Sequence, residues 1–96
     1  MTENKYKDAV VSIVAKQLPE CRIYLYGSRA RQDHKEGSDI DIALDNSAPI
    51  AWATLAKIRE ELEESTIPVT IDIVDVHAID KEFYDVIAKD WKIWKP

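Results

Sequence analysis

The chain has 96 residues, of which 46% are hydrophobic and 32% are charged, and its net charge is −5. This length suits one domain with a modest core, and the share of apolar residues excludes an extended disordered chain. Because phosphate backbones are bound by clustered lysine and arginine, the acidic charge argues against independent binding of DNA or RNA. The acidic charge is compatible with binding of a small phosphorylated ligand through bound cations.

The sequence indicates neither a membrane protein nor a secreted one. No apolar run approaches the ~20 residues that span a bilayer, and the N-terminal residues lack the apolar stretch of a secretory signal. Cys21 is the only cysteine, which rules out an internal disulfide, and we interpret it as a small apolar residue at the start of a strand. We therefore expect a cytoplasmic protein that forms one domain over residues 1–96.

The first part of the chain predicts a helix followed by a short strand. Apolar residues recur at the spacing of one helical face over residues 3–18, and Pro19 ends this helix. Residues 22–26 form a strand in which aliphatic residues and tyrosines alternate between the two faces. Gly27-Ser28 ends this strand abruptly.

A second strand, over residues 39–45, follows a polar connection over residues 29–38. Its two faces carry Asp39, Asp41 and Ala43 on one side and Ile40, Ile42 and Leu44 on the other. Only about a dozen residues join the first two strands, which leaves little room for a crossover helix. We therefore expect these two strands to pair antiparallel.

The next element is a helix that opens at Asn46-Ser47, carries Pro49 in its first turn and runs to about Ser65. Its expected buried stripe consists of Trp52, Leu55, Ile58 and Leu62. This helix is long enough to form a right-handed crossover between parallel strands.

A third strand over residues 69–75 is followed by a helix over residues 80–89 and by an edge strand over residues 91–95. The last helix is expected to bury Phe83, Val86 and Ile87. The order of elements predicts an α/β fold of the α+β type, a small mixed β-sheet of roughly three to four strands with helices packed against it.

Three aspartates lie at strand positions where packing residues would be more typical. Asp39 and Asp41 are two apart on one strand, so both carboxylates project from the same face, roughly 6.6 Å apart at the backbone. Leaning inward, they can share cations about 3.5–4 Å apart, as in two-metal phosphoryl transfer. Asp72 is turned outward because Ile71 and Ile73 occupy the core face of its strand. The set predicts a site for Mg²⁺, which prefers oxygen ligands together with substrate phosphates.

The Gly27-Ser28 turn supplies groups that bind phosphate. Glycine lets a phosphate approach the backbone amides, and Ser28 offers its hydroxyl and its N–H at what can be the start of a short helix. Arg29 or Arg31 can add charge-assisted contacts to the phosphates. Ser38 and Arg29 are further candidate nucleotide-binding residues. Taken singly, a Gly-Ser turn, an Asp-x-Asp pair and loop arginines are commonly structural, but their combination in this order is much more specific.

Other motifs fit the sequence less well. An EF-hand loop that starts at Asp39 lacks the required glycine and glutamate, and the P-loop signature is absent. Phosphatases of the haloacid dehalogenase type carry Asp-x-Asp after their apolar strand, whereas here the apolar residues follow the motif. A hydrolase built on Ser28 and His34 lacks the Gly-x-Ser-x-Gly elbow, so we interpret His34 and His77 as surface residues.

With these motifs in place, the sequence resembles the minimal nucleotidyltransferases (MNT) of the DNA polymerase β-like superfamily, which include the MntA-type antitoxins. The matching motifs are a hydrophobic strand, Gly27-Ser28, Asp39-Ile40-Asp41 and Asp72. The resemblance covers essentially the whole chain. Gln32 departs from it, because many relatives have glycine at that position.

The resemblance implies a metal-dependent attack of a hydroxyl group on the α-phosphate of an NTP, expected to be ATP, with release of pyrophosphate. Asp39 and Asp41 would bind two Mg²⁺ ions, or Mn²⁺ in their place. Asp72 would bind the catalytic ion and help to activate the acceptor hydroxyl. Gly27 and Ser28 would hold the β- and γ-phosphates.

The acceptor is expected to come from a partner, because we expect no further domain to supply it. Minimal nucleotidyltransferases are commonly paired with a small helical HEPN toxin, and in known cases they act as antitoxins by adenylylating a tyrosine of that toxin. Trp91 and Trp94 are expected either in such an interface or at the edge of the core. The alternative function is a non-catalytic module that neutralises a helical partner by contact alone.

Overall fold

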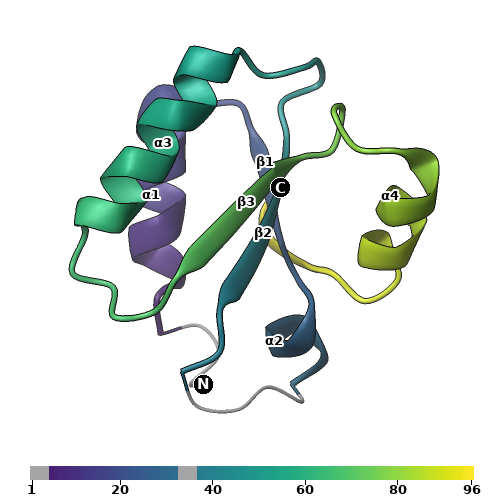
Figure 1. Ribbon diagram of the computed structural model, residues 1–96, viewed down its shortest axis with the longest axis horizontal. Helices are drawn as coiled ribbons and strands as arrows, with labels where there is room; N and C mark the ends of the chain where they lie inside the picture. Colours follow the sequence, from purple (N-terminus) through teal and green to yellow (C-terminus); the bar gives the residue numbers. More distant parts are fainter. Residues whose placement is uncertain (1–4, 33–36) are drawn as a thin grey trace.

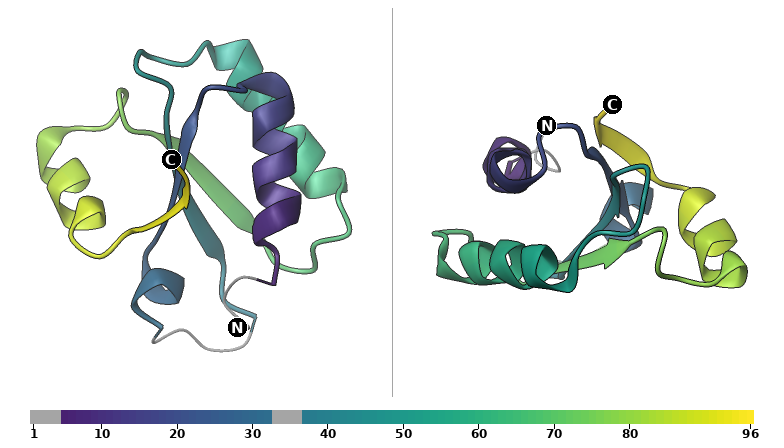
Figure 2. Two further views of the ribbon diagram at one scale, coloured as in Figure 1. Left: turned by 180° about the vertical axis from the view of Figure 1, so that it is seen from behind. Right: turned by 90° about the horizontal axis from the view of Figure 1, so that it is seen from above.

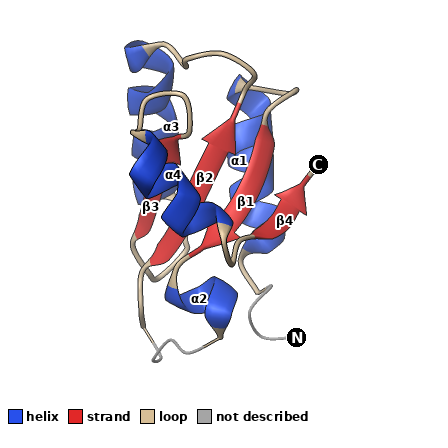
Figure 3. Cartoon of the chain, turned by 90° about the vertical axis from the view of Figure 1, so that its right-hand side faces the viewer, coloured by secondary structure: helices blue, strands red, loops and turns tan. Residues whose placement is uncertain are grey.

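The computed structural model describes residues 5–32 and 37–96, which form four helices and one four-stranded sheet (Figure 1). The helices are α1 (Lys7–Gln17), α2 (Ser28–Arg31), α3 (Trp52–Glu64) and α4 (Lys81–Ala88). The strands are β1 (Arg22–Tyr26), β2 (Ile40–Asp45), β3 (Ile71–Asp75) and β4 (Lys92–Lys95). The strand order is β3-β2-β1-β4, as Figure 3 shows across its width. The predicted fold class is confirmed.

The pairing of the strands follows the lengths of their connections. β1 pairs antiparallel with β2 and with β4, and β2 pairs parallel with β3. The predicted antiparallel pairing of the first two strands and the predicted parallel crossover through α3 are both confirmed. The bounds of β1 match the prediction, whereas β2 begins at Ile40 rather than at residue 39 and β3 at Ile71 rather than at residue 69.

Helices cover both faces of the sheet: α1 and α3 lie on one side and α4 on the other (Figure 2). The larger core lies under α1 and α3 and includes Val10, Val14, Ile23, Leu25, Ile40, Ile42, Leu44, Ile58 and Leu62. A smaller cluster on the α4 side consists of Ala43, Val76 and Ile87, with Tyr24, Tyr26, Val74, Ile79, Tyr84 and Trp91 packed against it. The predicted alternation of β2 between its two faces is thus confirmed.

The predicted first helix is observed as α1, whose Val10 and Val14 are fully buried. Residues 3 and 4 of the prediction lie outside the described residues. Cys21 is fully buried at the start of β1, as expected, and burial raises the pKa of its thiol to about 11. Over residues 5–32 and 37–96, the structure contains no helix of the length and apolar character that crossing a membrane requires.

The predicted start of α3 is wrong. The helix begins at Trp52, and the preceding residues form an extended connection in which Ser47 takes a positive φ of 68°. The Asp45 side chain accepts the N–H of Ser47 at 3.0 Å, so the capping-type residues shape a turn after β2 rather than a helix end. Trp52 was expected in the buried stripe, but it is 81% exposed because the first turn of α3 extends beyond the core.

The predicted buried face of α4 is partly wrong. Ile87 is buried, but Phe83 is 39% exposed and Val86 is 65% exposed. Tyr84 and Ile87 face the sheet instead, three residues apart on one side of the helix. Asp80 caps this helix by accepting the N–H of Phe83 at 2.8 Å.

Trp94 is buried in the core, and Trp91 is part-buried against the smaller cluster. Trp91 stacks on Tyr24 with ring centroids 4.0 Å apart and contacts Tyr84 edge-on at 5.6 Å. Trp94, on β4, is only 6% exposed and packs in the larger cluster. Of the two expectations for these tryptophans, the structure supports their packing at the edge of the core.

The end of the sheet where β2 and β3 terminate is held by two carboxylates. Asp45 lies at the surface of this end and accepts the N–H of Ser47. Its Oδ1 also lies 2.9 Å from Nε2 of His77. His77 is a surface residue, as predicted, whereas His34 lies outside the described residues. Asp75 is 4% exposed and accepts the N–H groups of Ile50 at 2.8 Å and of His77 at 2.9 Å.

We expect Asp75→Ala to destabilise the protein by about 3 kcal/mol, because two backbone N–H groups at a buried position lose their acceptor. Urea denaturation measures the change. Asp85→Ala is the control: this exposed residue pairs with Lys81 on the surface of α4, so its loss should cost less than about 0.5 kcal/mol. Similar changes for the two variants would contradict the structural role of Asp75.

Candidate active site

The phosphate-binding half of the candidate site begins where β1 ends. Gly27 takes φ 78° and ψ −156°, a region that is essentially restricted to glycine. Its carbonyl accepts the N–H groups of Ala30 and Arg31, both at 3.1 Å, and α2 starts at Ser28. The helix itself provides no acceptor for the N–H groups of Ser28 and Arg29. Such N–H groups at a glycine turn bind phosphate oxygens.

The carboxylates come from two neighbouring strands. Asp41 on β2 is the Cα partner both of Tyr26 on β1 and of Asp72 on β3. Residues directly opposite one another project to the same face, so these three side chains form a row across the sheet. Asp39 lies two positions before Asp41 and reaches the same face by alternation. This is the face on which α4 and α2 lie (Figure 3).

The two halves of the site meet at Gly27 and Asp41. A Cβ built on Gly27 would lie 2.5 Å from Oδ2 of Asp41, closer than real Cβ contacts allow. Glycine is therefore needed here for two reasons, its backbone conformation and the approach of the carboxylate. The same contact places the Asp41 carboxylate directly beside the turn that precedes α2.

Negative charge is concentrated at Asp41. Burial raises the pKa of this carboxyl, and the neighbouring Asp72 and Asp39 raise it further, while Arg31 acts in the opposite direction. Like charges that are held together in this way are stabilised by a bound cation. The electrostatics of the row thus favour a metal ion or a cationic group.

Tyr26 is a site residue that the sequence reasoning missed. Burial together with Asp41 and Asp72 raises the pKa of its hydroxyl to about 12, so that it remains a hydrogen-bond donor at neutral pH. The signal in the sequence was its position: it directly precedes Gly27 and shares a strand face with Tyr24, away from the aliphatic residues. The prediction assigned that face no function.

Arg29 connects the two motifs of the site. Its side chain is 8% exposed, and its Nε and Nη2 donate to the carbonyl of Ser38 at 3.1 and 2.8 Å. Because Ser38 directly precedes Asp39, this fork ties α2 to the start of the Asp-x-Asp segment. In this structure Arg29 positions the protein's own backbone, and a direct contact of Arg29 or Ser38 with nucleotide stays a prediction.

Gln32 ends α2 in the left-handed conformation, with φ 64° and ψ 27°. This conformation is the usual place for glycine at a helix C-terminus. Gln32 therefore replaces the glycine of many relatives without changing the backbone conformation, which is still the one that glycine favours. Residues 33–36 follow directly and lie outside the described residues.

Oxygen ligands of the kind that Mg²⁺ prefers lie on this face of the sheet. Among the described residues, no group of three or more histidine, cysteine, aspartate or glutamate side chains is arranged to hold a metal ion. Mg²⁺ does not require one, because it is usually held by one or two carboxylates with waters and substrate phosphates. Asp39, Asp41 and Asp72 supply hard oxygen ligands next to a phosphate-binding turn, and they are the residues that could hold it.

Comparison of the whole chain with protein families identifies its relatives. The family model "Polymerase beta, Nucleotidyltransferase" matches residues 10–94. The chain belongs to this family. The match runs from α1 to β4 and so includes every element that builds the site.

A curated relative in Haemophilus influenzae, named "Probable protein adenylyltransferase MntA", is 28% identical over 82 residues. The aligned part is 84% of this chain and 72% of the relative. The resemblance to minimal nucleotidyltransferases is thus confirmed, and as a member of the family the chain is a nucleotidyltransferase.

Solved toxin–antitoxin complexes contain chains of the same fold. One complex, solved with AMP-PNP, has a TM-score of 0.78 at 20% identity and is matched over 92% of this chain and 71% of the other. Another contains a tri-AMPylated Shewanella oneidensis HEPN toxin and its MNT antitoxin, with a TM-score of 0.75 at 18% identity over 96% and 71% of the two chains. The mixed sheet with its helices is therefore the nucleotidyltransferase fold.

Proposed function

We propose that this nucleotidyltransferase transfers AMP from ATP to a tyrosine hydroxyl of a HEPN-type partner protein, and that it acts as an antitoxin by this modification. The observation that carries the proposal is the row of Asp41 and Asp72 on one sheet face, with the Asp41 carboxylate directly beside Gly27. The row supplies ligands for the reacting phosphate, and the turn supplies amides for the leaving group.

The proposed reaction is a displacement at the α-phosphorus of ATP. The acceptor oxygen forms a bond to this phosphorus while the bond to the bridging oxygen of the β-phosphate breaks, and its electron pair leaves with pyrophosphate. The N–H and hydroxyl groups of Ser28 stabilise the departing phosphates. The hydroxyl proton passes to the carboxylate of Asp72 and from there to water.

Two Mg²⁺ ions, or Mn²⁺ in their place, would be held by Asp39 and Asp41, with Asp72 as a further ligand on the acceptor side. When bound, such ions neutralise the phosphate charge and polarise the reacting oxygens. The raised pKa of Asp41 supports this assignment, because burial and then the charges of Asp72 and Asp39 disfavour an uncompensated carboxylate there.

The relatives support adenylate as the transferred group and a HEPN protein as the acceptor. The Haemophilus influenzae relative is named as a protein adenylyltransferase. The structures of the same fold contain AMP-PNP in one complex and an AMPylated HEPN toxin in another. Trp94 is buried in the core and is not available to a partner, whereas Trp91 is part-buried.

The test is a transfer assay with this chain, its HEPN-type partner and ATP labelled at either the α- or the γ-phosphorus. We expect α-label to appear on the partner, no γ-label to appear there, and EDTA to abolish the transfer. Mass spectrometry should locate the added AMP on a tyrosine of the partner.

The outcomes separate the proposed function from its alternatives. Transfer of γ-label would show a kinase-type reaction and contradict nucleotidyl transfer. Neutralisation of the partner without transfer of either label would replace the proposal with a module that acts by contact alone.

A further inference from the structure

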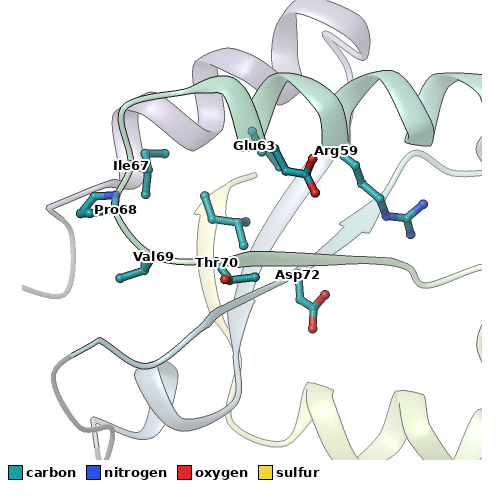
Figure 4. A pocket seen from close by; sticks show the side chains of 9 residues that line it. Arg59, Glu63, Ile67, Pro68, Val69, Thr70 and Asp72 are labelled. Atoms are coloured by element: carbon teal, nitrogen blue, oxygen red, sulfur yellow. The ribbon is translucent and has the colours of Figure 1, made fainter.

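A pocket of about 400 Å³ lies between the C-terminal half of α3 and the start of β3, at an outer edge of the sheet. Its lining consists of Arg59, Leu62 and Glu63 from α3 and of residues 67–72. Figure 4 shows Arg59 and Glu63 projecting from α3, and Asp72 projecting from β3 away from that helix. Asp72 lines the pocket, but its carboxylate projects to the opposite face of the sheet, where the row of carboxylates lies.

The reacting groups lie in an order across the sheet that ends at this edge. Gly27-Ser28 follows β1, Asp41 lies on β2 and Asp72 lies on β3, which is the outermost strand on this side. In an in-line displacement, the attacking and leaving oxygens lie on opposite sides of the phosphorus. With the leaving phosphates beside β1 and the α-phosphate at Asp41, the attacking hydroxyl approaches over β3 on the α4 face. The pocket lies at the same edge of the sheet but on the α3 face.

The outer edge of β3 offers backbone groups to an extended chain. In the parallel pair, alternate residues of β3 bond to β2, as the 2.9 Å bond from the N–H of Ile40 to the carbonyl of Thr70 shows. The N–H and C=O groups of Ile71 and Ile73 are directed to the opposite side, away from β2. Arg59 Nη2 lies 3.5 Å from the carbonyl of Ile73, so a polar side chain of the pocket reaches this edge.

We propose that the outer edge of β3 docks the acceptor, a short extended segment of the partner protein whose side chains alternate between the pocket on the α3 face and the opposite face, where the segment presents its hydroxyl side chain to Asp72. The proposal rests on the proposed function, because it assigns the place where the protein substrate of that reaction binds. Addition of a strand to an exposed edge is a common way of binding an extended segment: the backbone bonds provide affinity and side-chain pockets provide specificity.

The lining suits such a segment. Ile67, Val69 and Ile71 are part-buried and give the pocket an apolar side that can receive an apolar side chain next to the acceptor residue of the segment. Arg59 and Glu63 are exposed, lie four residues apart on one face of α3, and offer both charge signs to polar groups of the segment. An adenine ring is the competing occupant, and it would make the affinity for ATP depend on these same two residues.

The kinetic test uses the double variant Arg59→Ala/Glu63→Ala with the HEPN-type partner as substrate. We expect the KM for the partner to rise about tenfold, while the KM for ATP stays unchanged. The control is Lys57→Ala/Glu60→Ala, which also removes one positive and one negative exposed side chain from α3, but outside the pocket. The control should leave both KM values unchanged.

A second measurement follows hydrogen exchange at individual amides in the complex with the partner and without ATP. We expect the N–H groups of Ile71 and Ile73 to exchange at least about tenfold more slowly in the complex. This readout requires no chemistry, so it tests the docking site even if the proposed reaction is wrong.

The outcomes distinguish the two proposals. Protection at Ile71 and Ile73 without AMP transfer would support the docking site and overturn the proposed function. AMP transfer with an unchanged KM for the partner and no protection would overturn the docking site alone. A rise in the KM for ATP in the pocket variant would assign the pocket to the nucleobase and overturn the inference. If the partner neither binds nor is modified, both proposals are wrong.

Discussion

Asp41→Asn is expected to lose at least about 10³-fold in AMP transfer, because the amide no longer provides the charged oxygen at the centre of the row. The same variant should melt at or above the wild-type temperature in EDTA at neutral pH. The reason is electrostatic: the change removes a half-buried charge that Asp72 and Asp39 repel. Added Mg²⁺ should raise the melting temperature of the wild type and have little effect on the variant.

The pH dependence of stability has the sign that follows from a raised pKa. The folded-state pKa of Asp41 lies above its ordinary value of 3.8, so the native state holds more protons than the unfolded state in that interval. The contribution of Asp41 to stability is therefore present in full below the unfolded pKa and is lost as the pH rises through the folded pKa. Urea denaturation in EDTA across this range should show the loss in the wild type and not in Asp41→Asn.

Asp45→Asn is the matched control, since Asp45 lies on the same strand and the same face at the other end of the sheet. Burial acts to raise the pKa of Asp45, but the N–H of Ser47, His77 and Arg22 outweigh it and lower the pKa. Its stabilising contribution is thus present above the unfolded pKa and is lost as the pH falls through the folded pKa. Asp45→Asn should lose stability and keep AMP transfer. A destabilised Asp41→Asn that still transfers AMP would show that Asp41 has a structural role.

Gly27→Ala is expected to reduce AMP transfer by about 10²-fold, because a shift of the catalytic group by about 1 Å has an effect of that size. The new Cβ would lie 2.5 Å from the Asp41 carboxylate, which has to move out of the row. Steady-state transfer rates with saturating ATP and partner measure the effect. A melting curve in EDTA records how much the positive φ of 78° adds to it through strain.

Gly37→Ala is the control that separates the effect of the Cβ contact with Asp41 from the effect of a strained backbone. Gly37 also has a positive φ, 86°, but a Cβ there meets no atom of the described residues within 4 Å. Both alanine variants should lose about 1–3 kcal/mol of stability through strain, but only Gly27→Ala should lose most of its transfer rate. Equal rates for the two variants would show that the approach of Gly27 to Asp41 has no part in the reaction.

Local sequence patterns were sufficient for most of the fold. Alternation within residues 39–45 placed the isoleucines in the core and Asp41 on the opposite face, because the period of a strand leaves no other assignment once one face is buried. The lengths of the connections determined the antiparallel and parallel pairings in the same way. The candidate carboxylates and the glycine turn could therefore be named from the sequence.

Other features depended on which element covers which surface, and the sequence does not contain that information locally. Trp52 and Phe83 have the spacing of buried residues, but α3 begins beyond the core and α4 turns Tyr84 and Ile87 toward the sheet. Only the tertiary structure directed Arg29 onto the carbonyl of Ser38, because this contact joins segments separated along the chain. The approach of Gly27 to Asp41 and the pocket beside Asp72 arise likewise from the packing of α2, α3 and β3 around β2, which the residue order alone does not specify.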